Sequence, residues 1–283
     1  MAQVIRVQSL THPGIALFRD VTDADLRGAH GLCLVEGVRI VRRFLDWAAG
    51  PGAGARPSPE RLLLTPSCAE SLAGSLARHP DLPCFVGDEA LVNQIAGYRL
   101  HRGALALAQR GADPLPSALP SPPQLQTILA AEGVVHVDNL GSLFRNAGAF
   151  GSCGILLDSD CSDPLLRKTI RISAGRVFTV PWARAAHWPD TLRELAQRGW
   201  RLIAAENSPS AIALGQLPPG GPTVVVLGRE GAGLSPQTMD LCHAVVRIPM
   251  ADPDVRINAD DRPSLNVAVA SAVFLHELRR SGA

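Results

Sequence analysis

The chain has 283 residues, of which 46% are hydrophobic, 19% charged and 4% aromatic, and 27 basic against 26 acidic side chains leave a net charge of +1. This composition excludes a disordered or fibrous protein, and the length is sufficient for two domains. The near-zero charge excludes a long-range basic field, so a nucleic-acid partner would require a local cationic patch.

The six cysteines give no sign of a metal site or of disulfides, because they form no C-x-x-C pair and lie far apart. Such cysteines are typical of buried thiols in a reducing compartment. No apolar stretch reaches the roughly 18 residues of a membrane helix, and the first residues do not resemble a signal peptide. We therefore expect a cytoplasmic protein without a metal or a membrane partner.

Residues 1–110 alternate short apolar runs with helical stretches, which predicts a small α/β domain. Strands are expected at 32–35, 62–64 and 104–108, and a helix at 38–48. Residues 111–123 contain five prolines, which favours a stiff, extended linker between two domains.

Residues 124–283 have the rhythm of a parallel sheet covered by helices. Strands are expected at 127–131, 154–157, 201–204, 223–227 and 244–248, and helices at 191–198 and 264–280. Ligands of such sheets bind beyond the carboxyl ends of the strands, and three segments near those ends are unusual.

The first segment, 137–151, reads VDNLGSLFRNAGAFG. Asn139 and Gly141 fit a tight turn, and Arg145 follows on the first turns of a helix, a combination that favours anion binding. The alternative is that Asn139 caps the helix and Arg145 is a solvated surface charge.

The second segment, 224–235, reads VVVLGREGAGLS, a buried strand that enters a glycine-rich turn. Glycines allow backbone N–H groups to approach a ligand, and Glu230 adds a carboxylate at the end of the strand. The order G-x-x-G-x-G differs from the dinucleotide fingerprint, and the chain lacks a G-K-[ST] phosphate loop. A purely structural role for the glycines is the alternative.

The third segment comprises 248–250 and, after a loop, 264–267. Asn266 is expected one turn into an apolar helix, where a buried amide without partners would cost roughly 1 to 3 kcal/mol. Ser264 is expected to be the N-cap of that helix, which is also its structural explanation.

Together, in this order and at these spacings, the three segments resemble the sequence motifs of the SpoU (TrmH) family of RNA 2′-O-ribose methyltransferases, within the SPOUT superfamily. RISAGRVFTVP (171–181) resembles the family's S-A-G-x-x-x-x-x-P segment. LVEGVRIV (34–41) and RGALALAQ (102–109) resemble the N-terminal substrate-binding domain of many members. The resemblance therefore extends over nearly the whole chain.

The resemblance implies a small α/β RNA-binding domain (1–110), a linker (111–123) and a knotted, parallel-sheet methyltransferase domain (124–283), assembled as a homodimer. It implies methyl transfer from S-adenosylmethionine to a ribose 2′-hydroxyl of tRNA or rRNA, with the modified base left open. The catalytic positions of the family are occupied by Asn139, Arg145, Glu230, Ser264 and Asn266. The cofactor-binding positions are Leu227, Gly228, Gly233, Ile248, Met250 and Leu265.

The family mechanism makes Arg145 the activator of the hydroxyl, although a guanidinium is essentially always protonated. Two versions stay open: Arg145 accepts the proton, or it remains charged and orients a phosphate while another group takes the proton. The loop 251–263 is about twice the expected length and carries four aspartates, so it could be a lid, a block to RNA or inert.

A cationic patch for RNA is expected at Arg39, Arg42 and Arg43, which share one face of the helix at 38–48. A solvated helix face is the alternative. The competing functional hypothesis is a catalytically inactive RNA-binding relative with the same fold. An unrelated hydrolase is disfavoured because no G-x-S-x-G motif occurs.

Overall fold

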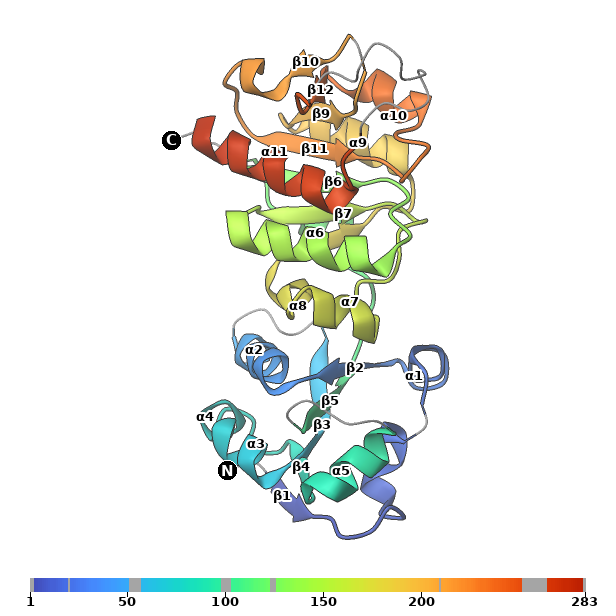
Figure 1. Ribbon diagram of the computed structural model, residues 1–283, viewed down its shortest axis with the longest axis vertical. Helices are drawn as coiled ribbons and strands as arrows, with labels where there is room; N and C mark the ends of the chain where they lie inside the picture. The colour runs from blue at the N-terminus through green and yellow to red at the C-terminus, as the bar shows by residue number, and fades with distance from the viewer. Residues whose placement is uncertain are drawn as a thin grey trace. The chain divides into compact units, whose positions relative to one another are not determined.

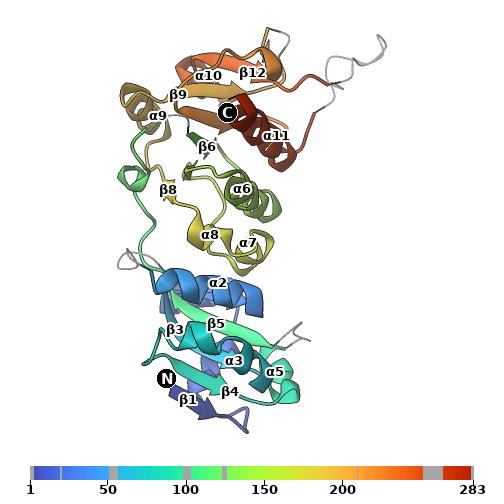
Figure 2. The same cartoon turned by 90° about the vertical axis from the view of Figure 1, so that its left-hand side faces the viewer.

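The structure of the protein is a computed structural model that describes residues 3–19, 21–50, 57–97, 103–122, 126–208, 210–250 and 264–281. The chain forms two compact units (Figure 1 and Figure 2). The first comprises Met1–Ala112 and Pro164–Thr179, and the second comprises Asp113–Asp163 and Val180–Ala283. Residues 164–179, which the sequence-based division assigned to the second domain, thus pack with the first unit.

The first unit contains a mixed sheet with the strand order β1-β4-β3-β5-β2. The strands are β1 (Gln3–Arg6), β2 (Leu32–Glu36), β3 (Ser58–Leu64), β4 (Pro83–Val86) and β5 (Ala104–Gln109). β4 pairs in parallel with β1 and β3, whereas β5 pairs antiparallel with β2 and β3. The three expected strands of this domain are present, and β1 and β4 are additional.

Helices surround this sheet, and their starts follow local capping rules. They are α1 (Asp23–His30), α2 (Val38–Ala48), α3 (Pro66–Ser71), α4 (Ala73–Leu76), α5 (Glu89–Ala96), α7 (Arg167–Ile172) and α8 (Arg176–Thr179). Thr22 and Asp25 form a capping box at α1, and the Asp88 side chain caps α5. α2 has the predicted bounds because its apolar residues Val41, Phe44 and Leu45 recur on one buried face.

Three contacts explain why residues 164–179 belong to the first unit. The ring of Phe178 packs on that of Phe44, with centroids 4.7 Å apart. Arg167 Nε lies 2.9 Å from Glu36 Oε2, and the Arg43 guanidinium donates to the carbonyl of Ala174. These residues are far apart in sequence, so the linear pattern does not reveal their association.

The proline-rich segment after residue 110 is packed and not an extended spacer over its described part. Residues Pro116–Ala118 form a short 3-10 helix, η3, and Leu119 is buried in the core of the second unit. Arg184 Nε also binds Asp113 Oδ2 at 2.8 Å. Burial of an apolar side chain favours this packing over a solvated linker.

The second unit contains a seven-stranded sheet in the order β10-β12-β9-β11-β6-β7-β8, and all its recorded pairs are parallel. The strands are β6 (Thr127–Ala131), β7 (Gly154–Leu157), β8 (Trp182–Arg184), β9 (Arg201–Ala205), β10 (Ile212–Ala213), β11 (Thr223–Leu227) and β12 (Ala244–Arg247). The predicted parallel sheet is confirmed, and β8 and β10 are additional.

Helices cover both faces of this sheet. α6 (Val137–Phe150) and α11 (Val267–Ser281) lie side by side on one face, and α9 (Trp188–Gln197) and α10 (Pro236–Leu241) lie on the other (Figure 1 and Figure 2). The side chains of Trp188, Leu192 and Leu195 on α9 join the sheet in one apolar core.

Two local predictions are wrong. Asn139 and Gly141 lie inside α6 and not in a turn before it, since the helix already begins at Val137. α11 begins at Val267 and not at Ser264.

Among the described residues, no helix is long and apolar enough to span a bilayer.

We expect Phe44→Ala to destabilise the first unit by about 3 kcal/mol, because a buried phenylalanine truncated to alanine loses burial and leaves a cavity. Chemical denaturation followed by tryptophan fluorescence measures this change. Val4→Ala, at a side chain that is 61% exposed, is the control and should change stability by less than about 0.5 kcal/mol. Equal effects of the two substitutions would contradict the assignment of Phe44 to the core.

Candidate functional site

The glycine-rich turn after β11 closes on itself. Arg229 and Gly233 exchange two backbone hydrogen bonds of 3.1 and 3.0 Å. A Cβ atom on Gly228 would collide with the Gly233 backbone, and Gly231 has a φ of 82°. The geometry therefore requires glycine at these places.

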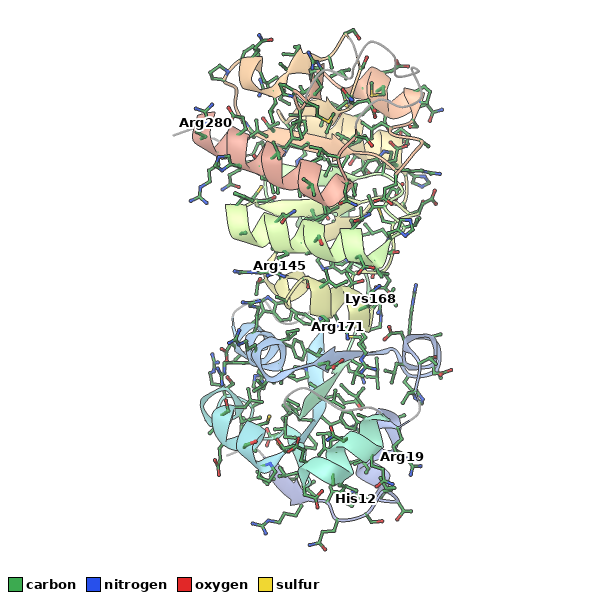
Figure 3. The ribbon with its side chains drawn as sticks, in the orientation of Figure 1. His12, Arg19, Arg145, Lys168, Arg171 and Arg280 are labelled. Atoms are coloured by element: carbon green, nitrogen blue, oxygen red, sulfur yellow. The ribbon has the colours of Figure 1, made fainter. Side chains whose placement is uncertain are left out.

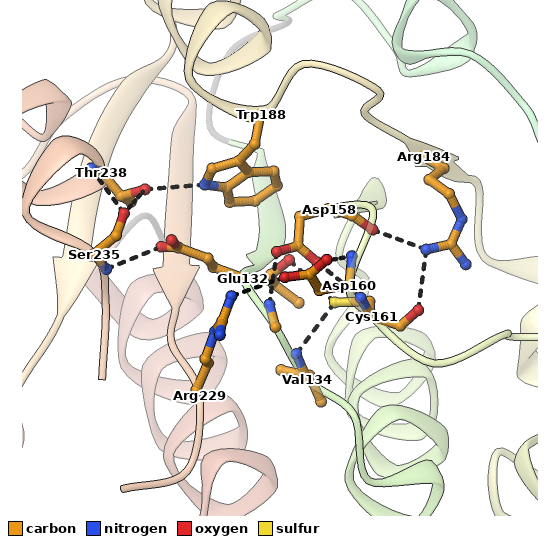
Figure 4. A network of polar contacts seen from close by, with 12 residues as sticks. Glu132, Val134, Asp158, Asp160, Cys161, Arg184, Trp188, Arg229, Ser235 and Thr238 are labelled. Atoms are coloured by element: carbon orange, nitrogen blue, oxygen red, sulfur yellow. Dashed lines mark hydrogen bonds and ion pairs between the residues drawn. The ribbon is translucent and has the colours of Figure 1, made fainter. Parts of the chain in front are cut away.

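A polar network holds this turn against the neighbouring strand ends (Figure 4). The N–H of Ser235 donates to Glu132 Oε2 at 3.3 Å, and Trp188 Nε1 donates to Thr238 Oγ1 at 3.0 Å. On the other side, Arg229 Nη2 lies 2.8 Å from Asp160 Oδ2. The turn is thus fixed at both of its ends.

Asp158, at the end of β7, links the loop after β6 to the loop after β7 (Figure 4). Its buried carboxylate accepts hydrogen bonds from the N–H groups of Gly133 and Cys161, both at 2.8 Å, and of Asp160 at 3.1 Å. Burial raises the pKa of Asp158, and the hydrogen bonds from Cys161 and Gly133 oppose the rise. The carboxyl ends of β6, β7 and β11 consequently form one rigid frame.

The carboxylate of Glu230 accepts hydrogen bonds from two asparagines beside this frame. Asn139 Nδ2 donates to Glu230 Oε1, and Asn266 Nδ2 donates to the same oxygen at 2.9 Å and to Asn139 Oδ1 at 3.0 Å. Three of the five predicted catalytic residues, Asn139, Glu230 and Asn266, thus form one cluster, which we call the amide–carboxylate cluster.

Asn266 is the N-cap of α11, which corrects the expectation that it lies one turn inside the helix. Its Oδ1 accepts a hydrogen bond of 2.9 Å from the N–H of Ala268. Both ends of the amide are therefore bonded, and Asn266 is exposed, which also corrects the expectation of a buried amide. Ser264, the expected cap, lies before the helix and is exposed.

Arg145 lies outside the amide–carboxylate cluster. It is exposed on α6 and has no hydrogen bond or ion pair with the residues that the structure describes (Figure 3). Arg145 lies six positions after Asn139, which corresponds to a rotation of about 240° around the helix axis, so the two side chains leave different faces. The guanidinium is therefore available to a partner outside this part of the chain.

A cavity of about 610 Å³ lies beside the cluster, in the second unit. It is lined by all six predicted cofactor-binding residues, namely Leu227, Gly228, Gly233, Ile248, Met250 and Leu265. Glu230, Ser264 and Asn266 also line it. Residues that are separate in sequence thus meet at the carboxyl ends of β9, β11 and β12.

Three further charged residues line this cavity and were not predicted: Glu206, Arg247 and Arg229, which is paired with Asp160. Glu206 follows β9 directly, and its Oε2 accepts a long hydrogen bond of 3.4 Å from the N–H of Leu234. Arg247 ends β12, and its Nε is buried without a partner among the described residues. The sequence signal that could have identified Glu206 and Arg247 is their position at the ends of predicted strands, where ligands of parallel sheets bind.

The lining suits a cofactor with an apolar body and several polar groups. Leu227, Ile248, Met250 and Phe274 provide apolar walls. Glu206 can accept hydrogen bonds from hydroxyl or ammonium groups, and the unpartnered Arg247 Nε can donate to an acceptor. S-adenosylmethionine combines an adenine, a ribose, a sulfonium and an amino-acid tail, so its chemistry fits these residues.

The expected cationic patch on α2 is smaller than predicted. Arg39 is exposed, whereas Arg42 Nη2 donates to the carbonyl and the hydroxyl of Ser71, both at 2.7 Å. Arg43 is half-buried against Ala174, and burial, with Arg176 nearby, lowers its pKa. Arg43 therefore serves packing within the first unit.

Part of the expectation lies outside the described residues. This part is the acidic loop 251–263. Among the described residues, no group of three or more His, Cys, Asp or Glu side chains could hold a metal ion.

Comparison with known proteins connects this geometry to a family. The model of the SpoU rRNA Methylase family matches residues 126–276. An uncharacterized tRNA/rRNA methyltransferase of Mycobacterium bovis is 33% identical over 280 residues, which cover 95% of this chain and 90% of that protein.

Solved structures agree with this match. The crystal structure of an AdoMet-bound rRNA methyltransferase from Sinorhizobium meliloti has a TM-score of 0.79 and 26% identity, covering 99% of this chain and 98% of that one. An RNA 2′-O ribose methyltransferase shares the fold, with a TM-score of 0.68 and 24% identity over 98% and 99% of the two chains. The chain belongs to the SpoU rRNA methylase family and is an RNA methyltransferase that uses S-adenosylmethionine.

Proposed function

We propose that the protein transfers a methyl group from S-adenosylmethionine to a ribose 2′-hydroxyl of tRNA or rRNA. One observation carries the proposal: the amide–carboxylate cluster borders the cavity that all six predicted cofactor residues line. A methyl group held in that cavity next to the cluster would be near polar groups suited to orient a hydroxyl. The family's solved relative named as an RNA 2′-O ribose methyltransferase has the same fold, which is consistent with this reaction.

The cofactor supplies the electrophilic methyl group, and the protein supplies position. Glu230 holds the amides of Asn139 and Asn266 in register, and both amides retain an oxygen or hydrogen for further contacts. Arg145, exposed and without a partner among the described residues, suits a phosphate of the acceptor RNA. Of the two versions left open by the sequence, we favour the one in which Arg145 stays charged, since guanidinium groups keep their proton.

The proposal includes a knotted second unit and a homodimer. β12 lies between β9 and β10, whereas α11, the next described element, packs on α6 and contacts β6 and β11, and this arrangement supports the proposed knot. The start of α11 exposes Leu265 and Val269, apolar side chains that a second subunit could cover. In a homodimer, residues of the second subunit would also complete the site around Arg145.

The first unit is proposed to contact RNA through Arg39 and Arg42 on α2. Such contacts with phosphates would provide affinity but no base specificity. The labelling experiment described next therefore has to identify whether the substrate is tRNA or rRNA.

Incubation with methyl-labelled S-adenosylmethionine and RNA from cells lacking such modifications, followed by nucleoside analysis, tests the reaction. The expected product is a labelled 2′-O-methylnucleoside, and its base and parent RNA identify the substrate. Label on a base would contradict ribose methylation. Cofactor and RNA binding without any transfer would support the inactive RNA-binding relative.

We expect Arg145→Ala to lower turnover by about 100-fold or more, because a mispositioned acceptor costs on the order of a hundredfold in rate. The cofactor Kd, measured by calorimetry, should stay within about twofold, since Arg145 does not line the cavity. Arg193→Ala is the control, because Arg193 is an exposed arginine on α9 that pairs with Asp190. Unchanged turnover of Arg145→Ala would remove this residue from the mechanism.

We expect Asn139→Ala and Asn266→Ala each to lower turnover by about 100-fold, and the double variant to lose much less than the product of both, because the two amides share one carboxylate. Rates of the single and double variants measure this coupling. Asn146→Ala, which removes an amide contact from α6 to Ala268 outside the cavity, is the control. Fully multiplicative losses would contradict a shared function of the cluster.

A further inference from the structure

A histidine that the sequence did not single out faces the amide–carboxylate cluster. His136 Nε2 lies 3.4 Å from Glu230 Oε2, and the His136 side chain is 66% exposed. His136 occupies the N-cap position of α6, yet its side chain makes no capping hydrogen bond. Helix capping therefore does not explain the orientation of this imidazole.

His136 lines a second cavity, of about 200 Å³, in the second unit. This cavity is lined by residues of the loop after β6, the start of α6, the glycine-rich turn and the start of α11: Gly133, Val134, Val135, His136, Asn139, Arg229, Glu230 and Val267. Arg229, Glu230 and Val267 also line the larger cavity. The two cavities, a larger one for the cofactor and a smaller one, therefore meet at the amide–carboxylate cluster.

We infer that the smaller cavity binds the acceptor ribose and that His136 removes the proton from its 2′-hydroxyl. The inference rests on the proposed function and adds the acceptor site and the proton acceptor. The hydroxyl oxygen forms a bond to the methyl carbon, the carbon–sulfur bond breaks, and its electron pair stays on sulfur to give S-adenosylhomocysteine. The proton passes from the hydroxyl to the imidazole, and from there to water.

The carboxylate explains how the imidazole is prepared for this step. Glu230 Oε1 already accepts from the two amides, so Oε2 is the oxygen that faces His136. A carboxylate favours the tautomer with hydrogen on Nε2, which leaves Nδ1 free to accept a proton. The same carboxylate stabilises the imidazolium that forms, as in the catalytic triads of hydrolases.

The charged groups around His136 come from two elements. The glycine-rich turn contributes Glu230 and Arg229, of which Arg229 is paired with Asp160. Its own helix contributes Asp138, two residues later, and the described start of α11 contributes the apolar Val267. The close acidic partner is thus Glu230.

Single-turnover methylation by His136→Gln, at saturating RNA and cofactor and across pH 5 to 9, tests the inference. We expect the rate to fall by about 100-fold, within the usual contribution of general base catalysis, and the acidic limb of the wild-type pH profile to disappear. The Kd of S-adenosylmethionine, measured by calorimetry, should stay within about twofold, because His136 does not line the larger cavity.

The matched control is His187→Gln, since His187 is also an exposed N-cap histidine without a side-chain capping bond, at the start of α9. A His136→Gln enzyme with wild-type rate and an unchanged acidic limb would overturn the inference while the proposed function stands. If the wild type itself places label on a base and not on a ribose, the proposed function fails, and this inference with it. Thermal unfolding of both variants should match the wild type, because both side chains are exposed.

Discussion

The carboxylate of Glu230 is the interaction on which the site depends. One of its oxygens accepts hydrogen bonds from Asn139 and Asn266, and the other faces His136. These residues come from the glycine-rich turn, α6 and α11, which are more than a hundred residues apart at their extremes. The Asn139 side chain is buried, and a buried amide without an acceptor would cost free energy, whereas Asn266 is exposed. The shared carboxylate joins the start of α6 to the start of α11 at the end of β11.

The parallel sheet makes this convergence possible. Because the recorded strand pairs of the second unit all run in one direction, β6, β7, β9, β11 and β12 end at one edge, and the loops after them meet there. The carboxylates of Asp158 and Glu132 hold three of these loops in place, because they accept hydrogen bonds from backbone N–H groups of the loops. A frame of this kind limits the motion of the cluster, and fixed polar groups reorganise little during a reaction.

The parts of the fold that the sequence predicts best are the strands buried on both faces. β6, β7 and β11 have the predicted bounds, because a continuous apolar run flanked by turns has one interpretation in a parallel sheet. β8 and β10 have three and two residues, too short for a periodic signal. The three-residue cluster was predicted through the family resemblance. His136 and Glu206 were not, since their importance arises from side chains that approach them from distant segments.

The most direct test of this account is a crystal structure of the protein with S-adenosylmethionine bound. We expect the cofactor in the cavity lined by Gly228, Ile248 and Leu265, with its methyl group directed at the wall formed by Glu230 and Asn266. A cofactor bound elsewhere, or bound there with its methyl group directed toward Glu206, would contradict the claim that the methyl donor meets its acceptor at the amide–carboxylate cluster.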